Sequence, residues 1–477
     1  MSTQKESKTF SYTEQATKAI QQTERHEIPE QLKTLAKEAL NGKIKWDTNL
    51  SNTINSAINI IDKALSKQVS VIIHHKKFRK LEGTWRGLHY LVSNTKTSDM
   101  LPIRVFNVSK RELVEDFMEA GRFDKSQVFM KIYEAEFGLA DGEPYGAMIG
   151  DYEFSSSSDD VELLTNMSNI AAKGVFPFIS AAAPKMFGFD SFTELYKLDG
   201  FSKLVETTEY DKWNKFRETE NSRFVLLSVP RVLARLPYDS EKSVTAFNFE
   251  ELKPSEDDDY HALESDFNCW MNAAFVIGTA LTDMFENYGL SIFTYGVNYS
   301  RINGATLLKY PTQITIKEQQ GAELAKLGFV AIRQCRNAND GIQLGNQTTK
   351  KAEVFDDPNE TSDAAFSTRL PYIMLISRIA QTLVVMTRCK VASIKDAKEV
   401  ERHSNQWIQR YVNNNQGVGA EEKAKYPLEK ASIEIVQNSE SSNEYDIVIH
   451  SIPWIANGRL FAPLKFVANM IPKPNWG

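Results

Sequence analysis

The chain of 477 residues lacks the features on which several large classes of protein depend. It has only three cysteines, Cys269, Cys335 and Cys389, and their wide spacing fits neither a disulfide framework nor a zinc site. It has no dense run of Lys or Arg, and its formal net charge is −6, so it lacks the cationic surface from which nucleic-acid binders draw affinity. We therefore expect a cytoplasmic protein that does not bind nucleic acid.

The sequence also lacks a clear membrane span. Its most apolar segment, residues 370–387, contains Pro371, Arg378 and Gln381, and an arginine near the middle of a span is costly. We interpret this segment as a buried core helix and expect no membrane insertion. The first 19 residues are polar, without an apolar core or a cleavage site, and do not resemble a secretory signal.

Short motifs of catalysis and cofactor binding are absent as well. There is no GxxxxGK[ST] phosphate loop, GxGxxG fingerprint or GxSxG elbow, and no histidine has metal-binding spacing. We predict no catalytic residue, no metal site and no cofactor. The alternative is a cytoplasmic metal-dependent α/β enzyme whose metal site includes the acidic loop Asp257–Asp259 beside His261, although the spacing of a calcium loop is missing.

What is present begins with two helical patterns near the N-terminus. After a polar arm at residues 1–49, Ile54, Ile58, Ile61 and Leu65 follow one another at steps of four, three and four. This spacing predicts a coiled-coil-like stripe on one helix face. The stripe either packs within the chain's own core or docks on a partner helix.

The second helical pattern is FRKLEGTWRGLHYLV, residues 78–92, which combines a stripe of large apolar side chains with two glycines. Gly83 and Gly87 each cost about 1 kcal/mol relative to Ala in a helix interior. A physical reason for two glycines four residues apart is the close approach of another backbone. That backbone belongs either to a partner or to the chain's own core. The stripe consists of Phe78, Leu81, Trp85, Leu88 and Val92.

Further along the chain, strand and helix patterns alternate, which predicts a mixed α/β core. We expect strands at residues 102–110 and 176–184 and a buried apolar helix at residues 267–289. Near the C-terminus, Ser432–Gln437 and Tyr445–Ser451 alternate on either side of a turn-rich loop, which predicts a β-hairpin.

The hairpin places four isoleucines on one face. A lone hairpin is marginal in water, so we expect added strands, and strand edges near a chain end invite pairing with another chain. The four are Ile433, Ile435, Ile447 and Ile449, with Val448 between the last two.

Several segments closely resemble the large sheath subunit of bacterial type VI secretion systems, the TssC or VipB family. The resemblance covers residue 50 to the C-terminus and implies a structural subunit with a contractile-sheath fold, similar to phage tail and pyocin sheaths. The segments that carry it are FRKLEGTWRGLHYLV (78–92), IGDYEF (149–154), PFISAAAPKMFGFDSFTEL (177–195), FRETENSRFVLLSVPRVLARLPY (216–238) and YPTQITIKEQQGAELAKLGFVAI (310–332).

The resemblance also implies partners. The family pairs with a small sheath subunit, TssB or VipA, and polymerises on a baseplate around an inner tube of Hcp hexamers. Contraction of the sheath drives the tube into a target cell, and the AAA+ ATPase ClpV then disassembles it. We accordingly expect an interface with the small subunit at Ile54, Ile58, Ile61, Leu65, Gly83, Trp85 and Gly87, and strands shared between subunits at Ile433, Ile435, Ile447, Val448 and Ile449.

The expected domains follow from the resemblance and the patterns together. An N-terminal arm occupies residues 1–49, and a helical region at residues 50–95 docks the small subunit. A mixed α/β sheath core spans residues 96–365. A C-terminal sheath domain at residues 366–477 faces the inner tube and ends in the shared strands.

Overall fold

The structure is a computed structural model. It forms two units, residues 1–78 with 237–255 and residues 79–236 with 256–477. The expected N-terminal arm and the acidic loop Asp257–Asp259 lie outside the described residues. The described residues are 50–138, 142–197, 200–201, 207–238, 247–251, 268–288, 297–298, 301–302, 305–306, 312–334, 341–344, 347–387, 394–415, 417, 419–437, 445–454 and 460–469.

The first unit is built on helix α2 (Leu50–Ile73), which confirms the helix predicted from the apolar stripe. Helix α3 (Lys76–Ser93) follows, and the division between the two units falls after Phe78, inside this helix. The second unit contains a sheet of six strands. Their order is β1 (Met148–Phe154), β2 (Phe178–Ala182), β3 (Val225–Val229), β9 (Phe329–Gln334), β10 (Gly341–Leu344) and β6 (Val297–Asn298).

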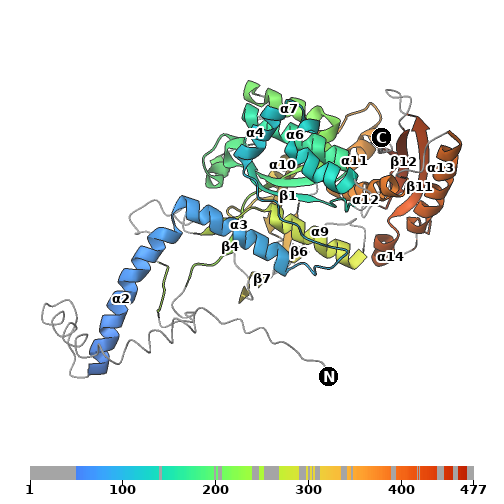
Figure 1. Ribbon diagram of the computed structural model, residues 1–477. Coiled ribbons are helices and arrows are strands. Elements are labelled where there is room, and N and C mark those ends of the chain that lie inside the picture. Colours follow the sequence, from blue (N-terminus) through green and yellow to red (C-terminus); the bar gives the residue numbers. More distant parts are fainter. Residues whose placement is uncertain are drawn as a thin grey trace, which may run out of the picture. The chain divides into compact units, whose positions relative to one another are not determined.

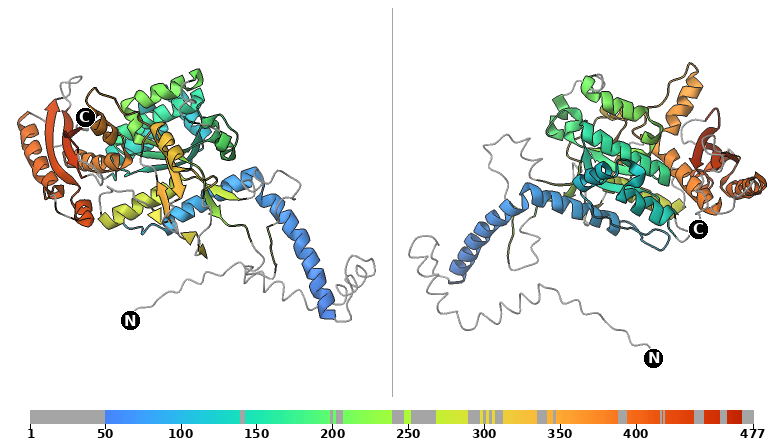
Figure 2. Two further views of the ribbon diagram at one scale, coloured as in Figure 1. Left: turned by 180° about the vertical axis from the view of Figure 1, so that it is seen from behind. Right: turned by 45° about the horizontal axis from the view of Figure 1, so that its top comes forward.

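The first four strands of this sheet are parallel, and β10 is antiparallel to both its neighbours. Helices lie on both faces, with α4 (Lys110–Ala120) and α6 (Ser158–Gly174) on one face and α9 (Ala274–Tyr288) on the other (Figures 1 and 2). Side chains alternate between the faces along each strand. In β9, Phe329 joins the core on the α6 side, whereas Val330 joins the core on the α9 side.

The remaining elements connect these layers or form the C-terminal region. The remaining α-helices of more than one turn are α7 (Asp211–Glu218), α10 (Glu318–Lys326), α11 (Pro358–Ser367), α12 (Leu370–Thr387), α13 (Ile394–Ile408) and α14 (Ala420–Lys425). The short strands are β4 (Val232–Arg235), β5 (Cys269–Met271), β7 (Arg301–Ile302) and β8 (Ala305–Thr306). A π-helix, η2, spans Met130–Gly138. The short helical turns are η1 (Phe123–Lys125), α5 (Gln127–Phe129), η3 (Pro184–Phe187), η4 (Phe192–Lys197), η6 (Thr208–Tyr210), η7 (Glu220–Phe224) and η9 (Gln409–Tyr411).

Two predicted elements are wrong in part. Residues 102–109 form no strand, because they have no partner strand among the described residues and Pro102 lacks a donor. Ser109 instead caps α4, since its hydroxyl accepts the N–H of Glu112 while the Glu112 carboxylate accepts the N–H of Ser109. The apolar helix expected from residue 267 begins only at Ala274, and Cys269–Met271 within the expected range form β5.

The C-terminal region confirms the predicted hairpin. Strands β11 (Leu428–Gln437) and β12 (Tyr445–Pro453) are antiparallel, and Ile433 lies opposite Ile449. A third strand of the same chain, β13 (Leu464–Asn469), pairs with the other side of β12. The sheet packs on α12, whose side chains are mostly buried, so the prediction of a core helix at residues 370–387 is confirmed.

Candidate assembly surfaces

Helix α2 turns small and polar side chains toward the rest of the first unit. Asp62 Oδ2 accepts the backbone N–H of Asn248 at 3.4 Å, and Ser66 Oγ accepts that of Glu250 at 3.4 Å. These bonds hold residues 247–251 against the helix. The buried side chains along it are Ala57, Asp62, Ser66, Ser70 and Ile73.

The end of that segment is fixed by a buried carboxylate. Glu251 Oε1 lies 2.8 Å from His74 Nε2, and Glu251 Oε2 accepts the N–H of Tyr238 at 2.9 Å. The Glu251 side chain is fully buried. The inner side of α2 is therefore held mainly by polar contacts.

The apolar stripe predicted for α2 lies on another side of the helix and is exposed. Its four members show between 36% and 55% of their surface. Of the two alternatives for this stripe, packing within the chain's own core is wrong for the described residues. Docking on a partner helix stays a prediction. The four are Ile54, Ile58, Ile61 and Leu65.

The glycines of α3 face the chain itself. A Cβ atom on Gly83 would lie 2.3 Å from the carbonyl oxygen of Trp270, and one on Gly87 would lie 2.3 Å from Cδ2 of Phe275. The approaching backbone is therefore that of the chain's own core. The assignment of Gly83 and Gly87 to a partner interface is corrected, because their open side is already filled.

The opposite side of α3 carries its large apolar side chains to the surface. Trp85 is 63% exposed, and Leu81, Phe78 and Val92 are also exposed. An exposed tryptophan among exposed aliphatic side chains is typical of a protein interface. Helices α2 and α3 thus share an unusual arrangement, with small or polar residues inside and large apolar residues outside.

A buried ion pair lies beside Gly83. Glu82 accepts hydrogen bonds from Arg235 Nε at 2.6 Å and from Arg86 Nε at 2.7 Å. Burial raises the pKa of Glu82, but the bonds from Arg235 and Arg86 outweigh it and the net pKa is lowered. The pair holds α3 in place against β4.

The C-terminal sheet has two edges of different character. β12 is its central strand and is paired on both sides within the chain, so Ile447, Val448 and Ile449 cannot themselves receive a neighbour's strand. The expected sharing of strands stays a prediction, and it concerns the outer edges. At β13, Val467 is 49% exposed and Lys465 is exposed beside it.

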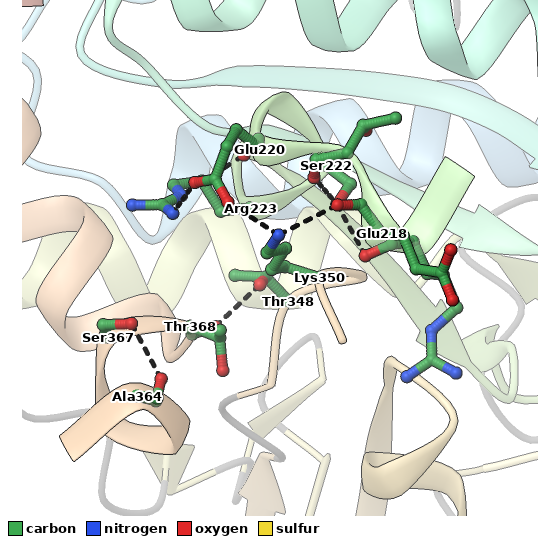
Figure 3. A network of polar contacts seen from close by, with 11 residues as sticks. Glu218, Glu220, Ser222, Arg223, Thr348, Lys350, Ala364, Ser367 and Thr368 are labelled. Carbon is green, nitrogen blue, oxygen red and sulfur yellow. Dashed lines mark hydrogen bonds and ion pairs between the residues drawn. The ribbon is translucent and has the colours of Figure 1, made fainter. Parts of the chain in front are cut away.

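The connector between the α/β body and the C-terminal region, residues 347–351, is held by buried polar groups (Figure 3). Lys350 Nζ donates to the carbonyl oxygen of Glu218 at 3.0 Å and to Glu220 Oε1 at 2.8 Å. Burial raises the pKa of Glu220, but Lys350 and Arg223 outweigh it and the pKa is lowered. A charged side chain is thus buried in the connector and paired with both a carbonyl oxygen and a carboxylate.

Two threonines of the connector bond to both sides. Thr348 Oγ1 donates to the carbonyl oxygen of Thr368 at 2.6 Å, just before α12. Thr349 donates through Oγ1 to Ser222 O at 2.7 Å and through its backbone N–H to Val225 O at 3.0 Å. No local pattern in the sequence marks this connector, because its bonding partners lie up to 132 residues away.

A catalytic or metal centre is not apparent in the described ranges. No group of three or more His, Cys, Asp or Glu side chains there could hold a metal ion. The acidic loop proposed for the enzyme alternative lies outside the described residues. One described helix, α12, is long and apolar enough to cross a membrane, but 72% of it is buried in the protein.

Comparisons with known proteins agree with the geometry of an assembly subunit. Residues 55–350 match the family described as EvpB/VC_A0108, tail sheath N-terminal domain, and residues 359–470 match its tail sheath gpW/gp25-like domain. The chain is 36% identical over 437 residues to the type VI secretion system sheath protein TssC1 of Pseudomonas aeruginosa PAO1, which covers 88% of this chain and 86% of that protein.

Two solved structures are more distantly similar. The baseplate of the anti-feeding prophage contains a chain with 12% identity and a TM-score of 0.36, covering 78% of this chain and 84% of that one. The contracted helical sheath of the anti-feeding prophage gives 11% identity and a TM-score of 0.31, covering 82% and 84%. At these scores the likeness carries no argument about this chain.

Proposed function

The chain belongs to the TssC/VipB family of type VI secretion system sheath proteins, and on this premise we propose that it pairs with the small sheath subunit TssB through the outer sides of α2 and α3. It is a structural subunit of a contractile sheath and not an enzyme. We further propose that the pairs polymerise on a baseplate around a tube of Hcp and contract to drive that tube into a target cell.

One observation carries the proposed pairing. The polar side of α2 is already bonded to residues 247–251, while the Ile and Leu side chains point away from its own unit. Because each such side chain is about half exposed, covering the rest of it is worth roughly half of the 1.5–3 kcal/mol expected for full burial. A helical partner with a matching apolar stripe fits this spacing, as in a coiled coil. On α3, Trp85 is likewise a large apolar side chain that is exposed.

Polymerisation requires contacts between pairs, and the C-terminal sheet offers one. We propose that an extended segment of a second copy of this chain adds to the outer edge of β13. The N-terminal arm, residues 1–49, is the candidate donor. It is also the candidate handle for the disassembling ATPase ClpV, which would act in the cytoplasm. The proposed domains at residues 50–95, 96–365 and 366–477 serve docking, the sheath body and the contact with the inner tube.

Co-expression with the small subunit tests the pairing. The double variant Ile58→Asp and Ile61→Asp places two charges in the exposed stripe, and we expect it to abolish co-purification and tube formation in negative stain. The matched control is Asn55→Asp with Asn59→Asp, two exposed polar positions of the same helix, which should pair normally. A normal yield of the heterodimer from the Ile58/Ile61 variant would refute the docking surface.

A further inference from the structure

Helix α13 lies beside the C-terminal sheet (Figure 1) and bonds the outer edge of β11 through its side chains. Glu401 Oε2 accepts the backbone N–H of Ile435 at 3.0 Å. One turn further along, Asn405 Oδ1 accepts the N–H of Ile433 at 2.9 Å, and Asn405 Nδ2 donates to the carbonyl oxygen of Ile433 at 2.7 Å. Side chains of a helix thus take the bonds that a neighbouring strand would take.

A third bond continues the series. Gln409 Nε2, just after α13, donates to the carbonyl oxygen of Ala431 at 3.2 Å. Four residues of a helix rise about 6 Å, and two residues of a strand span about 6.6–6.8 Å. The spacing of residues 401, 405 and 409 along the helix therefore matches that of residues 435, 433 and 431 along the strand. The helix runs antiparallel to the strand.

Asn405 imitates the backbone of a paired strand most closely. In an antiparallel sheet, the two residues of a hydrogen-bonded pair exchange both their N–H···O bonds. The Asn405 amide exchanges both bonds with Ile433 in the same way. Its Nδ2 also donates to the carbonyl oxygen of Glu401 at 3.0 Å, which fixes the orientation of the amide.

The pairing of the strands explains why these backbone groups are available. Each of residues 431–435 lies opposite a residue of β12, and residues alternate along a strand between bonding one neighbour and the other. The N–H groups of Ile433 and Ile435 bond Asn405 and Glu401, so these residues belong to the set that faces away from β12. The groups of residues 431, 433 and 435 therefore point away from β12, toward α13. By the same alternation, the backbone of Val467 points outward from β13. No bond from a side chain to this outward backbone occurs among the described residues.

We propose that Glu401, Asn405 and Gln409 form an edge cap that closes β11 to strand addition. Unpaired strand edges pair readily with other chains, and natural sheets protect them. The cap would leave β13 as the edge that receives an extended segment of another copy. That last step rests on the proposed function, whereas the closure of β11 does not.

Amide hydrogen exchange on the full-length chain tests the cap. In the variant Asn405→Leu, which nearly keeps the size of the side chain but loses both its acceptor and its donor, we expect exchange at Ile433 to rise about tenfold. Glu401→Ala should do the same at Ile435, while Glu401→Gln, which keeps an acceptor, should remain near the parent. The amides of Ser432 and Glu434, which face β12, serve as internal references and should not change.

Matched controls lie on the same helix. Gln406→Ala and Glu399→Ala alter exposed side chains of the same chemical kinds outside the ladder, and we expect no change in exchange. The double variant Glu401→Ala with Asn405→Leu should also self-associate more than the parent in light scattering, since β11 is then an open edge.

Two results would overturn the cap. Unchanged exchange at Ile433 and Ile435 in the variants would mean that the side-chain bonds protect nothing. An equal rise at Ser432 and Glu434 in both variants would mean that α13 supports the whole sheet and does not close one edge. Loss of sheath formation in other experiments would affect neither measurement, so failure of the proposed function remains distinguishable.

Discussion

The carbonyl oxygen of Trp270 lies so close to Gly83 that a Cβ atom on residue 83 would be only 2.3 Å from it. Gly83→Ala therefore forces a rigid backbone group aside. We expect a loss of about 1–3 kcal/mol in the free energy of unfolding, despite the better helix propensity of alanine. Chemical denaturation measures it. Gly146→Ala is the control, because its nearest neighbour would be 3.7 Å away. Equal stability of both variants would contradict the close packing.

Trp85 lies on the opposite side of the same helix and should behave in the opposite way. Because it is 63% exposed, Trp85→Ala should change the stability of the chain by less than about 0.5 kcal/mol. Its affinity for the small sheath subunit should fall at least tenfold, as expected for a tryptophan at an interface. Titration calorimetry of the pair measures this, with the exposed Lys80→Ala as control. Unaltered affinity would remove α3 from the proposed interface.

The ion pair of Glu82 should contribute to the free energy of unfolding in a way that depends on pH. The folded pKa of Glu82 lies below its ordinary value of 4.5, so the unfolded state binds more protons as the pH falls through this range. Its contribution is present above pH 4.5 and is lost as the pH falls toward the folded pKa. We expect Glu82→Gln to be less stable than the parent at pH 7, with the difference narrowing below pH 4.5. Urea unfolding at several pH values tests this, and a constant difference would contradict it.

The two bonds of Lys350 should contribute measurably to the free energy of unfolding. Lys350→Met keeps the aliphatic part of the side chain but loses both bonds, so we expect a cost of about 1.5–3 kcal/mol. Lys351→Met is the matched control, since the Lys351 side chain is 59% exposed. Thermal unfolding compares the two variants. If they unfold at the same temperature, the buried network does not hold the connector.

The outer edge of β13 provides a selective test of strand sharing. Proline at position 467 removes an N–H that points outward, so the ladder with β12 remains intact. We expect Val467→Pro to give stable heterodimers that do not polymerise. Proline at Ala468, whose backbone faces β12, should instead disrupt the sheet itself. Electron microscopy and thermal unfolding separate these effects. Long sheaths from Val467→Pro would exclude β13 as the acceptor edge.

The periodicity of apolar residues predicted many of the helices and strands. It did not predict which part of the protein packs against each of their faces. The steps between Ile54 and Leu65 predicted one stripe on α2, and the alternation of Ile433 and Ile435 predicted a hairpin. Periodicity says which residues share a face and leaves the neighbour of that face open. For this reason the sequence left the environment of Gly83 undecided, and it did not indicate that β13 of the same chain supplies the third strand.

The edge cap on β11 was harder to predict from the sequence than the helices and strands. Asn405 and Ile433 are 28 residues apart, and an asparagine on a helix is ordinarily an exposed residue. The spacing of Glu401, Asn405 and Gln409 was a possible signal, but it becomes informative only once the strand beside them is known. The buried role of Lys350 was likewise hidden, because lysine is rarely buried.

The fastened connector has a mechanical consequence. A pull applied to β13 passes through the sheet to α12 and reaches the α/β body by way of Thr368 and the connector. There the bonds of Thr349 and Lys350 to the α/β body carry the load in parallel, so they must fail together, and the bond between Thr348 and Thr368 lies in series with them. A joint of this kind stretches little before it breaks. Energy released at one end of the second unit would therefore move the other end, and little of it would be spent in extending the joint.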